Sequence, residues 1–116
     1  DVPRLAGRSE QARLAAAMAD IEANIALGLD LYELDNGDYP STEQGIGALL
    51  KEPGGAPKPI NWNGPYLKKK PKDPWGQDYV YEYTGTKGSG YKLYSLGPDG
   101  IEGNDDIPDW GDEKEE

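Results

Sequence analysis

Apolar side chains recur at spacings of three and four residues near the start of the chain, which indicates one face of a helix. Ser9 is a candidate N-cap, and the sequence Asp35-Asn36-Gly37-Asp38 is a typical helix stop. The pattern therefore predicts a long helix over 9–35 whose Ala-rich first half projects from the domain. The apolar stripe comprises Leu14, Met18, Ile21, Ile25, Leu29 and Tyr32, and Leu27, Leu31 and Leu34 are expected to widen it.

Turn and loop signals follow this helix. Ser41 and Gln44 have the spacing of a capping box, which predicts a short helix over 41–50. Residues 51–76 are rich in Pro and Gly and are expected to form a loop region.

Two runs of alternating polar and apolar residues, joined by a glycine-rich link, predict a β-hairpin over 77–96. Tyr79, Tyr81 and Tyr83 share one face of the first run. Such a face can serve as a carbohydrate platform, but a chain without Phe must build its core from other aromatic residues, so we expect it to cover the long helix. The elements together predict a single α+β domain over 1–110, followed by a disordered tail over 111–116.

The composition excludes several kinds of chemistry. The chain has 116 residues, no Cys and no His, so it lacks disulfides, thiol chemistry and the commonest general base. Its net charge of −10 argues against nucleic acid and anionic membranes as partners. Paired carboxylates can hydrolyse glycosides without His, but no spacing here places an acid in an apolar pocket. We therefore expect no enzyme.

A lysine cluster stands out against this acidic background. Residues 58–72 hold five lysines and no acid. The net charge opposes binding of phosphate or nucleic acid at this cluster. It is interpreted as a solvated, lysine-protected strand edge, with a contact surface for the acidic face of a neighbouring subunit as the alternative.

The segment 96–110 is rich in both carboxylates and glycines. It fails as an EF-hand, because a loop counted from Asp99 has Asn104 at its sixth position and Trp110 at its twelfth. Asp99, Asp105 and Asp106 nevertheless lie around two glycines, where oxygen ligands suit Ca²⁺ and the cation would cancel their mutual repulsion. From the residues alone, a calcium site and a solvated acidic loop remain open.

Three segments in this order resemble the major pseudopilins of the type II secretion system. They are LYELDNGDYPSTEQGIGALL (31–50), PYLKKKPKDPWGQDYVY (65–81) and LYSLGPDGIEGNDDIPDW (93–110). The resemblance implies a type IV pilin-like fold, with a long N-terminal helix packed on a small antiparallel sheet. It also implies a structural subunit of a periplasmic filament that helps to move folded proteins across the outer membrane.

The resemblance further implies a place and partners for the protein. The full-length chain is expected to be a single-pass inner-membrane protein of a Gram-negative bacterium, with this domain in the periplasm and an apolar helix upstream of Val2. It would assemble with copies of itself, with other pseudopilins and with inner-membrane secretion components. The fragment without that helix is expected to be a monomer.

The family's calcium site maps onto this chain residue by residue. The resemblance implies ligation by Asp99, Asp105 and Asp106 and by the backbone carbonyl of Leu96. The loop here is one residue shorter than in many family members, which makes Asn104 a candidate extra ligand.

Two other functions are consistent with the sequence. One is a secreted Ca²⁺-dependent binding module, and the other is a type IV pilin used in adhesion or DNA uptake. The absence of Cys opposes the second, because a disulfide closes the C-terminal loop of many type IV pilins.

Overall fold

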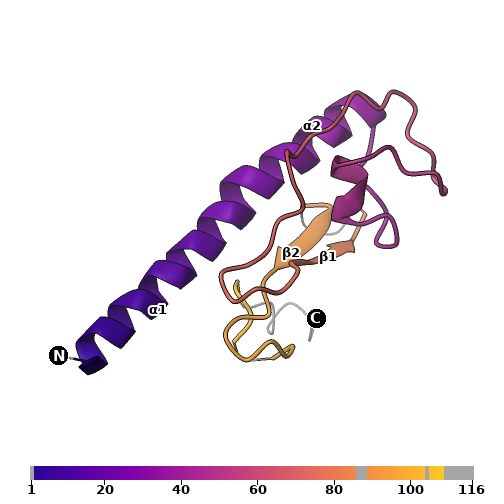
Figure 1. The fold of residues 1–116 in the computed structure, drawn as a ribbon. Helices are drawn as coiled ribbons and strands as arrows, with labels where there is room; N and C mark the ends of the chain where they lie inside the picture. The colour runs from indigo at the N-terminus through magenta and orange to yellow at the C-terminus, as the bar shows by residue number, and fades with distance from the viewer. Residues whose placement is uncertain (1, 86–88, 104, 109–116) are drawn as a thin grey trace.

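The domain is built on a single long helix. The computed structural model describes this helix together with residues 37–85, 89–103 and 105–108. The helix runs through α1 (Val2–Ala19), a π-helical segment η1 (Asp20–Ile25) and α2 (Ala26–Asn36), about 52 Å at 1.5 Å per residue. Figure 1 shows its N-terminal half projecting away from the domain, while the rest of the chain lies along its C-terminal half.

The ends of the helix differ in how well the sequence predicts them. Gly37, at φ 89°, stops the helix as expected and donates its N–H to Glu33 O at 2.7 Å. The expected start at Ser9 is wrong, because the helix begins at Val2 and runs through Ser9. Pro3 is compatible with this start, because N–H groups in the first turn of a helix have no partner within the helix, so the N–H that proline lacks is not needed there.

The buried face of the helix has a spacing of four residues through the π-helical segment. Ile25 and Leu29 are fully buried, and Gly28 lets the backbone of Tyr66 approach, so that a Cβ at Gly28 would lie 3.1 Å from Tyr66 O. The core gathers residues from every part of the domain, among them Ile21, Ile25, Leu29, Tyr32, Leu49, Leu67, Tyr79, Tyr81 and Leu93.

The leucines expected to widen this buried stripe do not join the core. Leu27, Leu31 and Leu34 are 60%, 41% and 78% exposed. A helix turns about 100° per residue, which places all three on the side opposite to Ile25. Leu14 is exposed as well, because no segment that the structure describes packs beside the projecting half of α1.

The capping box forms without the expected helix. Ser41 N–H donates to Gln44 Oε1 at 2.9 Å, and Gln44 N–H donates to Ser41 Oγ at 3.1 Å. Gly45, at φ 63°, then breaks the helical path, so only the short 3₁₀ helix η2 (Ile46–Leu49) remains of the segment 41–50. The Gln44 amide also donates to Pro57 O at 2.8 Å and thereby ties down the loop region.

The hairpin pairs β1 (Val80–Tyr83) with β2 (Tyr91–Tyr94) in an antiparallel register from Val80↔Tyr94 to Tyr83↔Tyr91. Both strands are shorter than the runs in the sequence, although an isolated bridge, Lys72↔Asp78, lies before β1. Tyr79 and Tyr81 are 6% and 8% exposed and belong to the core, so the prediction that the tyrosine face covers the helix is confirmed.

Phenol groups and carboxylates form the polar rim of this core. Four tyrosines donate a hydrogen bond to an aspartate in or just beyond the helix. Burial is the main cause that raises the pKa of Tyr39, Tyr66 and Tyr79, followed by these hydrogen bonds, whereas for Tyr83 the hydrogen bond comes first. The pairs are Tyr39–Asp30 (3.0 Å), Tyr66–Asp35 (2.6 Å), Tyr79–Asp20 (2.8 Å) and Tyr83–Asp38 (2.6 Å).

Ile25→Asp and Leu27→Asp should have opposite effects, although the two residues are only two positions apart. The first places an unpaired charge in the core and should lower the free energy of unfolding by about 3 kcal/mol or more. The second replaces an exposed side chain and should change it by no more than about 0.5 kcal/mol. Urea unfolding of both variants measures the difference, and equal losses would mean that the buried face is assigned wrongly.

The raised tyrosine pKa values predict a loss of stability in alkaline solution. Above the ordinary pKa of 10.0 the unfolded chain releases phenol protons that the folded chain still holds, so stability falls as pH rises through and beyond this value. Urea unfolding at a series of pH values up to and above 10.0 measures the slope. Tyr79→Phe should reduce this slope, and an unchanged slope would count against a role for the tyrosine.

Candidate metal-binding loop

The acidic loop begins where β2 ends, and a pair of backbone hydrogen bonds closes its base. Ser95 N–H donates to Ile107 O at 2.8 Å, and Ile107 N–H donates to Ser95 O at 2.9 Å. Figure 1 shows the loop in gold, at the opposite end of the domain from the C-terminus of α2. The bridge therefore holds a segment of about ten residues as a closed lobe on the end of the sheet.

Glycines let the two halves of this loop press against each other. Gly97 has φ 77°, and a Cβ on it would collide with the backbone of Asp105. Gly100 has φ 68° and donates its N–H to Gly97 O at 3.2 Å, which closes a turn around Asp99. The fold thus places the turn after Leu96 beside the backbone of Asp105.

The predicted ligands differ in their surroundings. Asp106 is 5% exposed, and its Oδ1 accepts the Gly103 N–H at 3.2 Å. Asp99 is exposed, and its Oδ1 accepts the Ile101 N–H at 2.9 Å. Asp105 is exposed and Leu96 is half-buried.

Several sequence predictions fall on residues that the structure does not describe. The candidate extra ligand Asn104 lies outside the described residues, as do Trp110 and the predicted tail 111–116. Among the residues described, no three acidic side chains come close enough to hold a metal ion. What the loop brings together is backbone: Gly97 lies against Asp105, while Asp99 and Asp106 each accept a nearby N–H.

The donor set of the loop is nevertheless compatible with Ca²⁺. The candidate ligands are carboxylates and a backbone carbonyl, and Ca²⁺ takes six to eight oxygens in flexible arrangements. The loop lies at the surface, closed at its base and rich in glycine, so the exposed carboxylates of Asp99 and Asp105 can turn toward an ion beside the buried Asp106 without disturbing the core. The calcium site stays a prediction.

A buried carboxylate outside the predicted site stabilises the start of the loop through hydrogen bonds. Asp73 is 4% exposed, and its Oδ1 accepts the N–H groups of Trp75 at 3.0 Å and Gln77 at 2.9 Å. Its Oδ2 accepts the Ser95 hydroxyl at 2.7 Å, and Ser95 Oγ in turn accepts the Gly97 N–H at 3.0 Å. The turn that starts at Asp73 is thereby linked to the start of the acidic loop.

Sequence reasoning did not identify this role of Asp73. The turn signal Asp-Pro-Trp-Gly in 73–76 predicts the local hydrogen bonds of the Asp73 side chain. The bond to Ser95 spans 22 residues and depends on tertiary structure, which no local pattern records.

Within the described part of the chain, none of the helices combines the length and the apolar character of a membrane span.

The chain matches one protein family over nearly its whole length. The family model for type II secretion system (T2SS), protein G, matches residues 4–110. Type II secretion system core protein G of Pseudomonas aeruginosa is 55% identical over 106 residues, which cover 90% of this chain and 73% of that protein. The protein of the same name from Vibrio cholerae is 45% identical over 114 residues, which cover 94% of this chain and 76% of that protein.

A solved structure shows the same fold. The crystal structure of the major pseudopilin from the type 2 secretion system of enterohaemorrhagic Escherichia coli matches with a TM-score of 0.81 and 39% identity, over 95% of this chain and 96% of that one. This chain therefore belongs to the type II secretion system protein G family, the family of the major pseudopilins.

Proposed function

We propose that this chain is the domain of a structural subunit of a pseudopilus, the filament that helps to move folded proteins across the outer membrane. The observation that carries the proposal is the likeness to a major pseudopilin over 95% of the chain, in fold as well as in sequence. In this proposal the full-length protein is anchored in the inner membrane, and the domain lies in the periplasm. Its role is mechanical and non-catalytic.

The projecting helix gives this proposal a physical basis. Ala17 is the one fully buried residue among the described side chains of α1, and residues 11–16 are exposed all round. A helix owes most of its stability in water to packing along one face, and the described residues of the subunit supply none to this half. In a filament, neighbouring subunits and other pseudopilins would supply that packing. Inner-membrane secretion components are the further partners that the family implies.

The proposal gives Ca²⁺ a structural role in the acidic loop. The ligands would be the carboxylates of Asp99, Asp105 and Asp106 and the backbone oxygen of Leu96, with Asn104 as an additional candidate. The ion would neutralise the repulsion between the carboxylates and keep the loop closed over its base at Ser95. Because the loop forms one end of the domain, its order would determine whether that end can contact the next subunit.

Deletion of the gene should abolish release of folded type II cargo into the medium, and the full-length protein should restore it. Overproduction should yield filaments that can be sheared from the cells and that contain this chain. The isolated chain of 116 residues should stay a monomer in light scattering, because the Ala-rich half of its helix offers little apolar surface for tight self-association. Normal secretion in the deletion strain, with every paralogue absent, would refute the proposed function.

Removal of Ca²⁺ should destabilise the domain and loosen its acidic loop. Binding to the folded state alone stabilises it by about 2.7 kcal/mol at a hundredfold excess of ion over Kd. EGTA should therefore lower the melting temperature and increase protease cleavage within 96–106.

Variants identify the ligands in the same measurement. Asp105→Ala and Asp106→Ala should resemble the chelated protein and should not respond further to EGTA. Glu102→Ala, which removes a carboxylate from the same loop, should respond like the wild type. A melting curve indifferent to both Ca²⁺ and EGTA would leave the solvated acidic loop as the correct interpretation.

A further inference from the structure

The outer edge of β1 is closed at each end by another part of the chain. At one end, Tyr83 N–H donates to Thr42 Oγ1 at 2.9 Å. At the other end, Asp78 forms an isolated bridge with Lys72. Residues 79–81 lie between these two closures, and of these Tyr79 and Tyr81 face away from β2, whereas Val80 faces it.

The alternation of an antiparallel ladder determines which way this backbone points. Thr84 N–H donates to Gly90 O at 2.9 Å, so Thr84 faces the β2 side of the hairpin. Tyr83, one residue before it, faces outward to Thr42. Tyr81 is two residues before Tyr83, and its N–H and C=O therefore point to the same outer edge.

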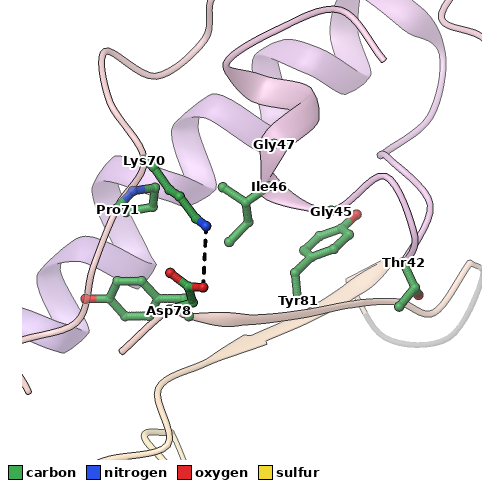
Figure 2. A pocket seen from close by; sticks show the side chains of 9 residues that line it. Thr42, Gly45, Ile46, Gly47, Lys70, Pro71, Asp78 and Tyr81 are labelled. Atoms are coloured by element: carbon green, nitrogen blue, oxygen red, sulfur yellow. Dashed lines mark ion pairs between the residues drawn. The ribbon is translucent and has the colours of Figure 1, made fainter. Parts of the chain in front are cut away.

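A cleft of about 240 Å³ lies along this stretch of the edge (Figure 2). Its walls come from the loop before η2, from η2 itself, from residues 70–71 and from the edge of β1. Pro71 in the facing wall has no N–H, so that segment cannot continue the ladder beyond the bridge at Lys72. The cleft has room for about eight water molecules at roughly 30 Å³ each, which is enough for a short piece of chain.

The mouth of the cleft is positively charged. Lys70 Nζ lies 3.4 Å from Asp78 Oδ2, and Lys72 Nζ lies 2.7 Å from Asp78 Oδ1. Lys68 and Lys69 are exposed and have no ion pair among the residues that the structure describes. Two lysines thus contact one aspartate here, which leaves an excess of positive charge in a chain whose net charge is −10.

The interior of the cleft is apolar, whereas its mouth is charged. Figure 2 shows the Ile46 side chain and the Tyr81 ring facing each other across it, with Lys70 above Asp78 at the mouth. A segment bound here could pair its backbone with the edge of β1 and place one side chain on Ile46. Its next side chains would point back toward the lysines, because successive side chains of an extended chain point to opposite sides.

We propose that this cleft binds an extended segment of another protein in which acidic and apolar residues alternate. The segment adds to the edge of β1 through main-chain hydrogen bonds, and its carboxylates contact the lysines at the mouth. Charge complementarity favours this occupant, and the acidic net charge disfavours a nucleic acid. The proposal goes beyond a role as a filament subunit, because it assigns a binding site for a non-subunit partner.

The probe is a fluorescein-labelled peptide of alternating Glu and Val, titrated with the 116-residue chain and followed by fluorescence anisotropy. Gly47→Trp should block the cleft, because a Cβ on Gly47 meets nothing within 4 Å and its backbone is unstrained. Gly54→Trp is the matched control, since Gly54 is equally open but lies outside the cleft. We expect saturable binding that Gly47→Trp weakens by about tenfold or more and that Gly54→Trp leaves unchanged.

Two further arms separate backbone pairing from simple charge attraction. Lys70→Glu should weaken binding, whereas Lys58→Glu, the same change of charge outside the cleft, should not. A peptide N-methylated at alternate residues should bind at least about tenfold more weakly, because it cannot pair with the edge of β1.

Four results would overturn the proposal. Three of them are no saturable binding, equal losses for the two tryptophan variants, and equal binding of the methylated peptide. A fourth is a change in filament assembly by full-length Gly47→Trp without a change in peptide binding, which would make a second copy of this chain the occupant.

Discussion

The packing of the tyrosine face of the hairpin on the helix is the contact on which the rest of the structure depends. Ile25 and Leu29 have no exposed surface, and the close approach at Gly28 brings the loop region against the same face. The sheet has two strands among the residues described, and such a hairpin is at best marginally stable in water by itself. The helix supplies the second layer that buries Tyr79 and Tyr81. Aspartates in or just beyond the helix accept hydrogen bonds from the hydroxyl groups of the surrounding tyrosines.

This arrangement also positions the two candidate binding regions. β2 runs from the buried Leu93 directly into Ser95, whose hydroxyl joins Asp73 to the start of the acidic loop. The opposite strand, β1, presents its outer edge to the cleft beneath η2. Both regions are therefore held by the same hairpin, and both would lose their geometry if the hairpin separated from the helix.

The sequence predicted those features that follow from local chemistry. The capping box of Ser41 and Gln44, the stop at Gly37 and the buried tyrosine face all depend on residue types and spacing within a short stretch. The alternation in 77–84 and 91–96 likewise predicted the hairpin. The strands are shorter than these runs, because side-chain alternation continues for one to three residues beyond the paired segments.

The failures have a common physical origin. An apolar side chain at helical spacing does not reveal whether a partner exists to cover it, and Leu27, Leu31 and Leu34 have none within the described structure. The start at Ser9 failed because a favourable cap does not end a helix whose upstream residues can also be helical. The bond between Asp73 and Ser95, and the cleft beside β1, are products of tertiary structure that only the folded chain could show.

The carboxylates of this acidic chain are stabilised in three different ways. Four aspartates in or just beyond the helix accept phenol hydrogen bonds. Asp78 is held by two lysines that lower its pKa, the hydrogen bond from Lys72 being the main cause. Asp73 is buried and accepts three donors from the protein. In the acidic loop, Asp99 and Asp106 accept backbone N–H groups of the loop itself, so these bonds hold the loop in its own turns and do not tie it to another element. In the proposed function, Ca²⁺ would bring positive charge to this loop, where Asp99, Asp105 and Asp106 lie close together in the sequence.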